Sequence, residues 1–293
     1  MQNLEYLRMF VIAAETGSFS ACARKLNKAQ SAISQGIANL EIDLGSQLFD
    51  RSKHRPTLTP QGERLLNYAN AVLMQTDELL TAAKAMTCDQ EASLVLAMDD
   101  AIFSPSLQSI LSQFTERFPA TALEILSIAS PDVATTVQSG RADIGLMFCD
   151  FVFPKEVDLC FLGNLPFYAV VSPEHPLAQL KSVKVSDLLP HRQILLKGVD
   201  GRELAQFAPL SAQRWWSNNF FMQSELVKQG MGWAYLPQHM AEQGIENKSL
   251  KELTLSFDHK PWSPPIDRVM QKNRTPGPAL NWMAENLKSL IED

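Results

Sequence analysis

The sequence predicts a mixed α/β protein in which a small helical head, a long linker helix and a larger α/β domain follow one another. Three observations predict this order. Two short helical patterns with a turn between them lie within the first 45 residues, a heptad-like apolar repeat then runs to about residue 87, and short apolar runs alternate with helical patterns beyond it. A chain of 293 residues suits two or three domains.

The head carries the pattern of a helix-turn-helix with a wing. Ser18 is placed to cap a short helix, and a tight polar turn at residues 27–29 precedes a second helix from about residue 30 to 44. The apolar residues of this second helix recur at spacings of four, three and four, which predicts a buried stripe of Ile33, Ile37, Leu40 and Leu44. A basic segment broken by Pro56 follows and is the predicted wing.

The outward face of the second helix is short and polar. Such side chains suit base edges in a major groove, because glutamine bonds adenine bidentately and serine bonds either kind of base. The predicted DNA-binding residues are Ser18, Ser20, Gln30, Ser31, Ser34, Gln35, Arg51, Lys53, His54 and Arg55, with the basic ones suited to phosphates. The alternative is a helical bundle with a solvated basic loop. Double-stranded DNA at a promoter or operator is therefore the expected partner.

A set of motif residues runs through the head with almost no gap. It includes Ser-Phe-Ser at 18–20, Gln-Ser-Ala-Ile-Ser at 30–34, Leu-Glu at 40–41, Leu-Gly at 44–45, Leu-Phe at 48–49 and Leu-Thr at 58–59. This set resembles the N-terminal signature of LysR-type transcriptional regulators. That family usually has Arg-Gln where this chain has Gln35-Gly36, and Gly36 costs about 1 kcal/mol relative to alanine inside a helix. The departure bears on site preference, not on DNA binding itself.

Charge is distributed unevenly along the chain. The net charge is -6, but residues 1–60 hold seven Lys/Arg and five Asp/Glu, a balance of +2, which leaves about -8 on the remainder. A slightly basic head on an acidic body is typical of a DNA reader with a separate sensing region. The apolar runs are too short to span a bilayer, and the first helix is amphipathic rather than a signal peptide. We therefore expect a cytoplasmic protein with no membrane partner.

A long helix is predicted for the linker at residues 59–88. Thr59 is a good N-cap and Pro60 suits the first helical position. The seam has apolar residues at alternating spacings of four and three, among them Leu65, Ala69, Val72, Leu79, Ala83 and Met86. We expect this seam to form a homodimer, and the alternative is packing against the body of the same chain. The family resemblance implies that a homotetramer is also common.

Beyond residue 89, apolar runs at 94–98, 123–128 and 143–148 alternate with helical patterns at 104–118 and 130–139. This order predicts a parallel βαβαβ sheet. Further strands are predicted at 167–171, 194–197, 233–236 and 269–272, and further helices at 224–229 and 278–291. The resemblance implies a two-lobed, periplasmic-binding-protein-like α/β domain. We assign residues 1–58 to the DNA-binding domain, 89–163 with 267–293 to lobe I, and 164–266 to lobe II.

Ligands of such folds bind at the carboxyl ends of strands, between the lobes. The predicted effector-binding residues are Asp99, Asp100, Ala101, Ser130, Phe148, Cys149, Lys197, Gln223 and Ser224. Helix starts at Ser104 and Ser130 attract anions, whereas two adjacent carboxylates repel them. Three alternatives follow for the carboxylate pair: one of the two caps a helix, the ligand has a cationic or hydroxyl part, or the pair is only a polar turn.

Other chemistries find no support in the sequence. The cysteines at 22, 88, 149 and 160 and the five histidines lack metal-ligand spacing, and there is no Gly-rich phosphate loop or nucleophile elbow. We expect no enzyme activity, cofactor or metal. A solute-binding or enzymatic protein with a helical head is the other class, but it leaves the basic wing unexplained. We expect a sequence-specific regulator that senses a small polar effector, with oxidation of Cys149 or a methionine as the alternative signal.

Overall fold

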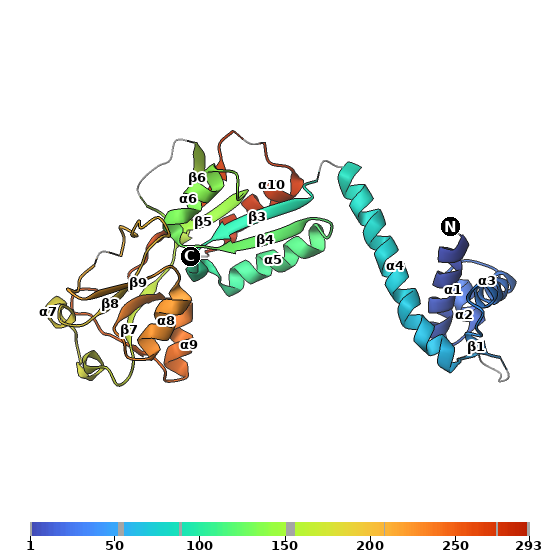
Figure 1. The fold of residues 1–293 in the computed structure, drawn as a ribbon, viewed down its shortest axis with the longest axis horizontal. Coiled ribbons are helices and arrows are strands. Elements are labelled where there is room, and N and C mark those ends of the chain that lie inside the picture. The colour runs from blue at the N-terminus through green and yellow to red at the C-terminus, as the bar shows by residue number, and fades with distance from the viewer. Residues whose placement is uncertain are drawn as a thin grey trace. The chain divides into compact units, whose positions relative to one another are not determined.

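The computed structural model describes residues 2–51, 56–87, 90–150, 156–207, 209–273 and 275–291. The chain divides into two compact units, Met1–Lys84 and Ala85–Asp293 (Figure 1). The first unit contains the head and most of the linker helix, and the second contains the α/β domain. Within the described residues, no helix combines the length and apolarity needed to cross a bilayer.

The head consists of α1 (Gln2–Thr16), α2 (Phe19–Lys25), α3 (Gln30–Leu44) and the paired strands β1 (Phe49–Asp50) and β2 (Thr57–Leu58). The Ser18 hydroxyl accepts a hydrogen bond from the Ala21 amide at 3.3 Å, which confirms the predicted cap of α2. In the turn before α3, Asn27 has a φ of 52°, a left-handed conformation that asparagine tolerates. The predicted helix-turn-helix is therefore confirmed, and its second helix has the predicted bounds.

The buried stripe of α3 is shorter than predicted. Ile33, Ile37 and Leu40 are buried in a core shared with α1, whereas Leu44 is 43% exposed. The prediction for Leu44 is wrong because α3 ends there, at Gly45 with a φ of 61°. The last turn of α3 thus extends beyond the head core.

Gly36 is buried where α1 packs on α3. A Cβ atom at this position would lie 2.4 Å from the Met9 Sδ and 3.0 Å from the Tyr6 ring. Glycine therefore permits the two helices to approach this closely. The close packing of α1 on α3 thus explains why this chain has glycine at position 36, where the family usually has a larger residue.

The linker helix α4 (Pro60–Thr87) is capped as predicted, since the Thr59 hydroxyl accepts a hydrogen bond from the Gly62 amide at 2.9 Å. Its first half packs on the head: Ala69 is buried, and Leu65, Leu66 and Leu73 contact the head core. Within the first unit, part of the predicted dimer seam is thus covered by the same chain. The side chain of Met86 lies outside the described residues.

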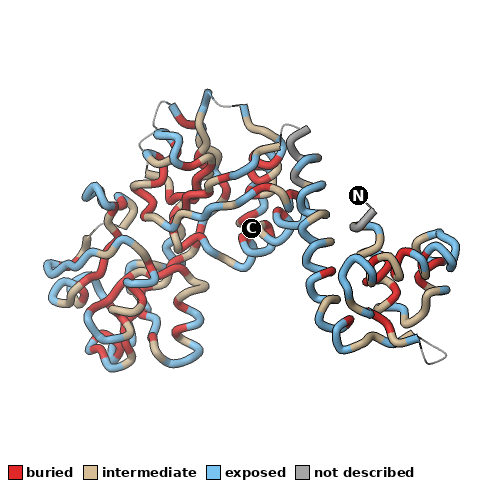
Figure 2. Tube along the Cα trace, turned by 45° about the vertical axis from the view of Figure 1, so that its right-hand side comes forward, coloured by how far each residue is buried: buried red, intermediate tan, exposed pale blue. Residues whose placement is uncertain are grey.

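A second stripe of α4 is exposed within this unit. Tyr68 is 70%, Val72 44% and Leu79 68% exposed, at spacings of four and seven, and Ala83 is also exposed. Figure 2 shows α4 mainly in pale blue, in contrast to the red strands of the second unit. The stripe lies beside the face that packs on the head.

Lobe I contains a five-stranded sheet in the order β4-β3-β5-β12-β6. The strands are β3 (Ser93–Met98), β4 (Ala122–Ser127), β5 (Ile144–Phe148), β6 (Val157–Asn164) and β12 (Pro265–Gln271). The first three are parallel as predicted, but β12 is antiparallel to β5 and β6. The direction of this last strand was not predicted, and it is antiparallel because the chain returns from lobe II and enters the sheet from the opposite end.

Helices cover both faces of the lobe I sheet. The helices α5 (Pro105–Arg117) and α10 (Pro278–Asn286) share one core with the sheet, and α6 (Ser130–Gln138) shares another. Two 3-10 turns complete the lobe: η1 (Asp100–Ile102), which follows β3, and η3 (Leu287–Ser289). The predicted return of the last strand and helix to lobe I is confirmed.

Lobe II contains β7 (Phe167–Val171), β8 (Gln193–Leu196), β9 (Arg214–Ser217), β10 (Ala234–Pro237) and β11 (Lys251–Glu252). The strands β10, β7 and β11 pair antiparallel, and β8 and β9 pair parallel. The helices are η2 (Pro176–Gln179), α7 (Val185–Leu188), α8 (Phe220–Lys228) and α9 (Gln238–Glu246). One apolar core runs through both lobes.

The helix α8 begins four residues earlier than predicted. Its N-cap is Asn219, whose Oδ1 accepts a hydrogen bond from the Met222 amide at 2.7 Å. Gln223 and Ser224 therefore do not stand at a helix start as expected. They lie beyond the first turn and are buried, with exposures of 1% and 4%.

Candidate DNA-reading surface and effector cleft

The N-terminal half of α3 presents a polar surface. Gln30, Ser31 and Gln35 are exposed and Ser34 is half-buried, while the opposite face of the helix is in the core. The Ser20 hydroxyl donates a hydrogen bond to the Gln30 Oε1 at 2.9 Å, which orients the carboxamide and leaves its N–H groups for another acceptor. This arrangement suits a major groove.

Gln35 is also held in place. Its Nε2 donates to the Asn39 Oδ1 at 2.9 Å, and the Asn39 Nδ2 donates to the Tyr6 hydroxyl at 3.4 Å. Through this chain of hydrogen bonds, α1 orients a side chain of the predicted reading surface. A preorganised amide loses less conformational entropy on binding.

Arg51 is fixed at the base of the wing. Its Nη2 donates to the Glu41 Oε2 at 2.7 Å, and its guanidinium lies 5.6 Å from the centre of the Phe19 ring. The other oxygen of Glu41 accepts the amides of Leu48 and Phe49. The remaining predicted wing residues, Lys53, His54 and Arg55, lie outside the described residues.

Asp99 and Ser130 are joined by hydrogen bonds inside lobe I. The buried Asp99 carboxylate accepts hydrogen bonds from the Ser130 amide at 2.8 Å, the Ser130 hydroxyl at 2.7 Å and the Ala101 amide at 3.2 Å. The Ser130 hydroxyl in turn accepts the Phe148 amide at 3.0 Å. Burial and the neighbouring Asp100 raise the pKa of Asp99 to about 7. The start of α6, where an anion was expected, therefore already holds a carboxylate.

Asp100 links the two lobes. Its Oδ1 accepts the Phe220 amide and its Oδ2 accepts the Phe221 amide, both at 2.9 Å. These amides belong to the first turn of α8 in lobe II, so Asp100 caps that helix from lobe I. Of the three alternatives for the carboxylate pair, helix capping is confirmed, and it applies to both carboxylates, because Asp99 caps η1.

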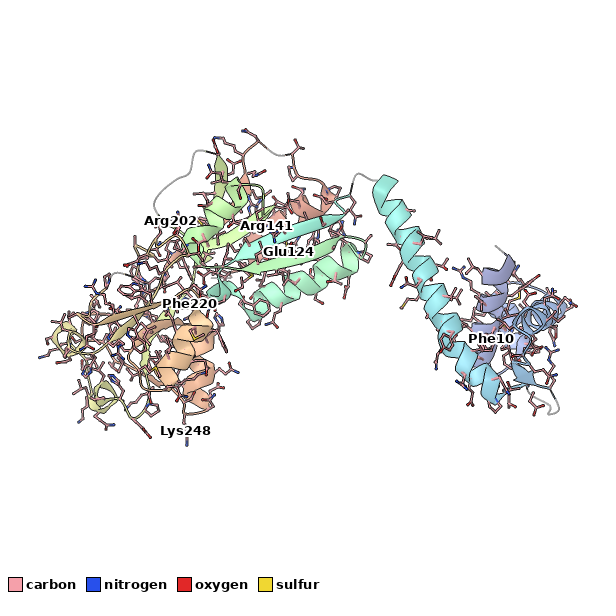
Figure 3. The ribbon with its side chains drawn as sticks, viewed as in Figure 1. Phe10, Glu124, Arg141, Arg202, Phe220 and Lys248 are labelled. Carbon is pink, nitrogen blue, oxygen red and sulfur yellow. The ribbon has the colours of Figure 1, made fainter. Side chains whose placement is uncertain are left out.

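A second set of polar contacts joins the lobes, and we call Asp132, Thr135, Val199 and Arg202 the clasp. The Val199 amide donates to the Asp132 Oδ2 at 2.8 Å, and the Arg202 Nη2 donates to the Thr135 hydroxyl at 3.1 Å. Arg202 and Phe220 both lie where the lobes meet (Figure 3). Gly198 lies so close to Asp132 that a Cβ there would be 2.6 Å from the carboxylate.

Next to the clasp, the Gln206 Nε2 donates to the Cys149 carbonyl oxygen. The Cys149 thiol donates to the carboxylate of Asp267, a residue whose pKa is raised by burial. Lys197 forms a 3.8 Å ion pair with Glu203, and its Nζ lies 5.1 Å from the centre of the Trp216 ring. The clasp residues and Gln206 were not predicted, since no sequence motif marks the loop that carries Val199, Arg202 and Gln206.

Aromatic rings fill the space between the lobes. Phe148 of lobe I contacts Phe167, Phe207 and Phe220 of lobe II, with ring centres 5.4 to 6.2 Å apart. Phe148 is fully buried, as is Ala101. These two predicted effector residues therefore belong to the core of the junction.

A pocket of about 410 Å³ opens at the junction on the side of α8 and α9, and we call it the junction pocket. Lobe I lines it with Met98, Asp100, Phe103, Ile125 and Ser127. Lobe II lines it with Phe221, His239, Met240 and Gln243. Asp100 is the one residue it shares with the predicted effector set, because α9 and the early start of α8 were not predicted.

Comparison with known proteins identifies the family. Residues 4–63 match the bacterial regulatory helix-turn-helix domain of the lysR family, and residues 89–291 match the LysR substrate binding domain. The second match alone spans more than half of the chain. The chain belongs to the LysR family and is a DNA-binding transcriptional regulator with an effector-binding domain.

Named relatives agree with this family. The chain is 30% identical to the HTH-type transcriptional regulator AceR of Acinetobacter baumannii over 289 residues, which cover 98% of this chain and 97% of AceR. It is 32% identical over 193 residues to a probable hydrogen peroxide-inducible genes activator of Mycobacterium avium, covering 65% of this chain and 61% of that protein. Full-length BenM superposes with a TM-score of 0.57 at 22% identity, covering 98% and 95% of the two chains, and shares the fold.

Proposed function

We propose that this regulator binds operator DNA as a homodimer, reads bases with the first half of α3, and responds to a small polar effector bound between the lobes. The polar face of α3 carries the proposal. Gln30 and Gln35 are exposed there and are held by hydrogen bonds from Ser20 and to Asn39, while the opposite face of the helix lies in the head core. Arg51 supplies a fixed cation at the wing for a phosphate.

Base reading is tested with Gln35→Ala on operator DNA selected from a random pool. Loss of a good bidentate contact changes the preference at one base pair by about 1–3 kcal/mol. Arg51→Gln is expected to weaken all sequences about equally and to lower the salt dependence of binding. Arg141→Gln, which removes an exposed arginine of lobe I, is the matched control for charge. Equal losses on operator and random DNA for Gln35→Ala would contradict base reading.

The exposed stripe of α4 supports dimerisation. Tyr68, Val72 and Leu79 lie on one side of the helix, and burying a glutamate there costs several kcal/mol. Leu79→Glu is expected to give smaller species in sedimentation and to lose operator binding. Met74 is 58% exposed on another face of α4, so Met74→Glu is the control and is expected to stay dimeric. If Leu79→Glu keeps the oligomeric state of the wild type, the dimer interface lies elsewhere.

The clasp side supports the effector site. Three hydrogen bonds join lobe I to one loop of lobe II here: Val199 to Asp132, Arg202 to Thr135, and Gln206 to Cys149. A polar ligand that enters here replaces some of these hydrogen bonds between the lobes with its own. Such an exchange shifts the balance between lobe arrangements. A panel of small carboxylic acids, alcohols and amines is screened by melting temperature. A compound that raises the melting temperature of the wild type is expected to lose this effect in Arg202→Leu and Gln206→Leu. It is expected to keep the effect in Lys181→Leu, the control. No hit across the panel would argue against this site.

Oxidation at Cys149 is a second candidate, favoured by the position of this residue at the lobe junction, where its carbonyl oxygen accepts a hydrogen bond from Gln206, and by the name of the mycobacterial relative. The hydrogen bond from the thiol to Asp267 opposes it, because a nearby carboxylate disfavours the reactive thiolate. Operator binding is measured before and after peroxide in the wild type and in Cys149→Ser. A peroxide response that disappears in Cys149→Ser would establish the redox signal in place of the small molecule.

A further inference from the structure

The strand β9 is an open edge of lobe II. It lies alongside β8 (Figure 1), and among the described residues β8 is the one strand that pairs with it. Every residue from 212 to 216 is exposed, whereas all four residues of β8 are buried. An exposed edge strand presents a row of backbone groups with which another extended chain can pair.

The outward backbone groups of this edge belong to Arg214 and Trp216. The Lys197 amide donates to the Ser217 carbonyl oxygen at 2.9 Å, so Ser217 directs its backbone groups toward β8. Backbone groups alternate in direction along a strand, and those of Trp216 and Arg214 therefore point away from β8. In the described part of the chain, no strand or isolated bridge pairs with them.

An indole ring stands on each face of this edge. Trp215 is 42% and Trp216 43% exposed, and neighbouring side chains of a strand point to opposite faces. The Arg192 guanidinium lies 4.0 Å from the centre of the Trp215 ring, and the Lys197 Nζ lies 5.1 Å from the centre of the Trp216 ring. A strand added here would find an apolar ring and a cation on both faces.

The edge is basic, although the part of the chain beyond residue 60 carries a net charge of about -8. Lys197 pairs with Glu203 at 3.8 Å. Arg192 and Arg214 each donate to a backbone carbonyl oxygen, and neither forms an ion pair with another described residue. Two arginines without a carboxylate partner on an acidic domain are complementary to an acidic partner.

Three kinds of occupant differ in what they use of this edge. A second copy of β9 would bring the same arginines together, and like charges on paired strands are destabilising. A nucleic acid would use the cations and the rings, but not the outward backbone groups of Arg214 and Trp216. An extended acidic peptide uses the cations, the rings and the backbone groups together.

We propose that β9 binds an extended acidic segment of another protein. The segment pairs with the backbone of Arg214 and Trp216, in the manner of a strand added to a sheet edge, and its carboxylates lie at Arg192 and Arg214. This surface shares no residue with the DNA-reading surface or with the clasp. It thus gives the regulator a place to hold a protein partner.

The test uses the full-length protein and a fluorescein-labelled peptide, Glu-Val-Glu-Val-Glu-Val-Glu, with Lys-Val-Lys-Val-Lys-Val-Lys as its basic counterpart. Binding is followed by fluorescence anisotropy. The acidic peptide is expected to bind about tenfold more tightly than the basic one. Arg214→Glu is expected to reverse this preference. Lys181→Glu, at an exposed lysine of lobe II that is not part of this edge, is the charge control and is expected to retain it.

A second pair of variants tests the backbone pairing. Trp216→Pro removes the outward N–H together with the ring, whereas Trp216→Ala removes the ring alone. Proline is tolerated on an edge strand where its missing N–H faces solvent, and circular dichroism checks that both variants are folded. The acidic peptide is expected to bind Trp216→Pro more weakly than Trp216→Ala.

Four results would overturn the proposal. They are equal binding of the two peptides, no binding of the acidic peptide up to millimolar concentration, a preference for the acidic peptide that survives Arg214→Glu, and equal binding of the acidic peptide to Trp216→Pro and Trp216→Ala. Single-stranded DNA that binds this edge more tightly than the acidic peptide would also overturn it, since a nucleic acid is then the occupant.

Discussion

The two sides of the lobe junction use the same chemistry to different ends. On the clasp side, Asp132 of lobe I accepts the Val199 amide of lobe II, and Arg202 adds a contact to Thr135. On the pocket side, Asp100 accepts the amides of Phe220 and Phe221, but a pocket remains open beside it. Asp99, next in the chain to Asp100, is buried and serves lobe I alone. The comparison shows that the backbone amides a carboxylate contacts, not its residue type, decide its role.

The largest effect is expected for Asp99→Ala. The substitution leaves the Ser130 amide, the Ser130 hydroxyl and the Ala101 amide without their acceptor in a buried site. Each unsatisfied buried donor costs about 1–3 kcal/mol, so the free energy of unfolding should fall by at least about 3 kcal/mol. Urea unfolding followed by circular dichroism measures it. A loss below about 1 kcal/mol would mean that water replaces the carboxylate.

The ionisation of Asp99 should give a pH-dependent effect. Its pKa is raised from 3.8 to about 7 on folding, so between these values the folded chain holds a proton that the unfolded chain has released. Stability contributed by this proton is complete below about pH 4 and is lost as pH rises to about 7. Asp99→Asn cannot ionise. The unfolding free energy of the wild type minus that of Asp99→Asn should therefore fall from pH 4 to 7, and a rise over this range contradicts the assignment.

Asp100→Ala should cost about 1–2 kcal/mol, the usual loss for a helix cap, because two amides of α8 lose their acceptor. Hydrogen exchange distinguishes this role from a general loss of stability. The amides of Phe220 and Phe221 should exchange faster, while the Val199 amide keeps its protection. Equal acceleration at all three amides would show that the lobes separate as a whole.

Asp132→Ala should have the smallest effect, about 1 kcal/mol, since it removes one hydrogen bond to an exposed amide. The exchange pattern should reverse: Val199 accelerates and the two α8 amides do not. Melting temperature is expected to change little. If both sets of amides accelerate, the clasp and the α8 cap form one cooperative unit and the two sides of the junction are not independent.

The spacing of apolar residues in the sequence predicted most of the helices and strands, because the buried residues follow this spacing closely. The caps at Ser18 and Thr59 and the parallel strands β3, β4 and β5 were all predicted. The strands on the other side of β5 were harder to predict. The strand β6 was missed, and the direction of β12 depends on where the chain re-enters from lobe II, which no local pattern encodes.

The site was predicted less completely, since it depends on contacts between distant segments. Strand ends indicated Asp99, Asp100 and Ser130, but not that the first and last bind each other or that Asp100 caps a helix about 120 residues further on. The start of α8 was placed too late because Asn219 is its cap and precedes two phenylalanines that also suit a strand. Arg202 and Gln206 lie in a loop without periodicity, so sequence alone gives them no role.

Gly36 has a consequence for engineering. Specificity is commonly exchanged between related DNA readers by transplanting the helix that enters the groove. Here a helix with a larger residue at this position requires Met9 and Tyr6 to move, since a Cβ atom comes within 2.4 and 3.0 Å of them. Tyr6 also anchors Gln35 through Asn39, so trimming it to make room would release a residue of the reading face. A transplant that carries α1 together with α3 keeps both the close packing at Gly36 and the hydrogen bonds that hold Gln35.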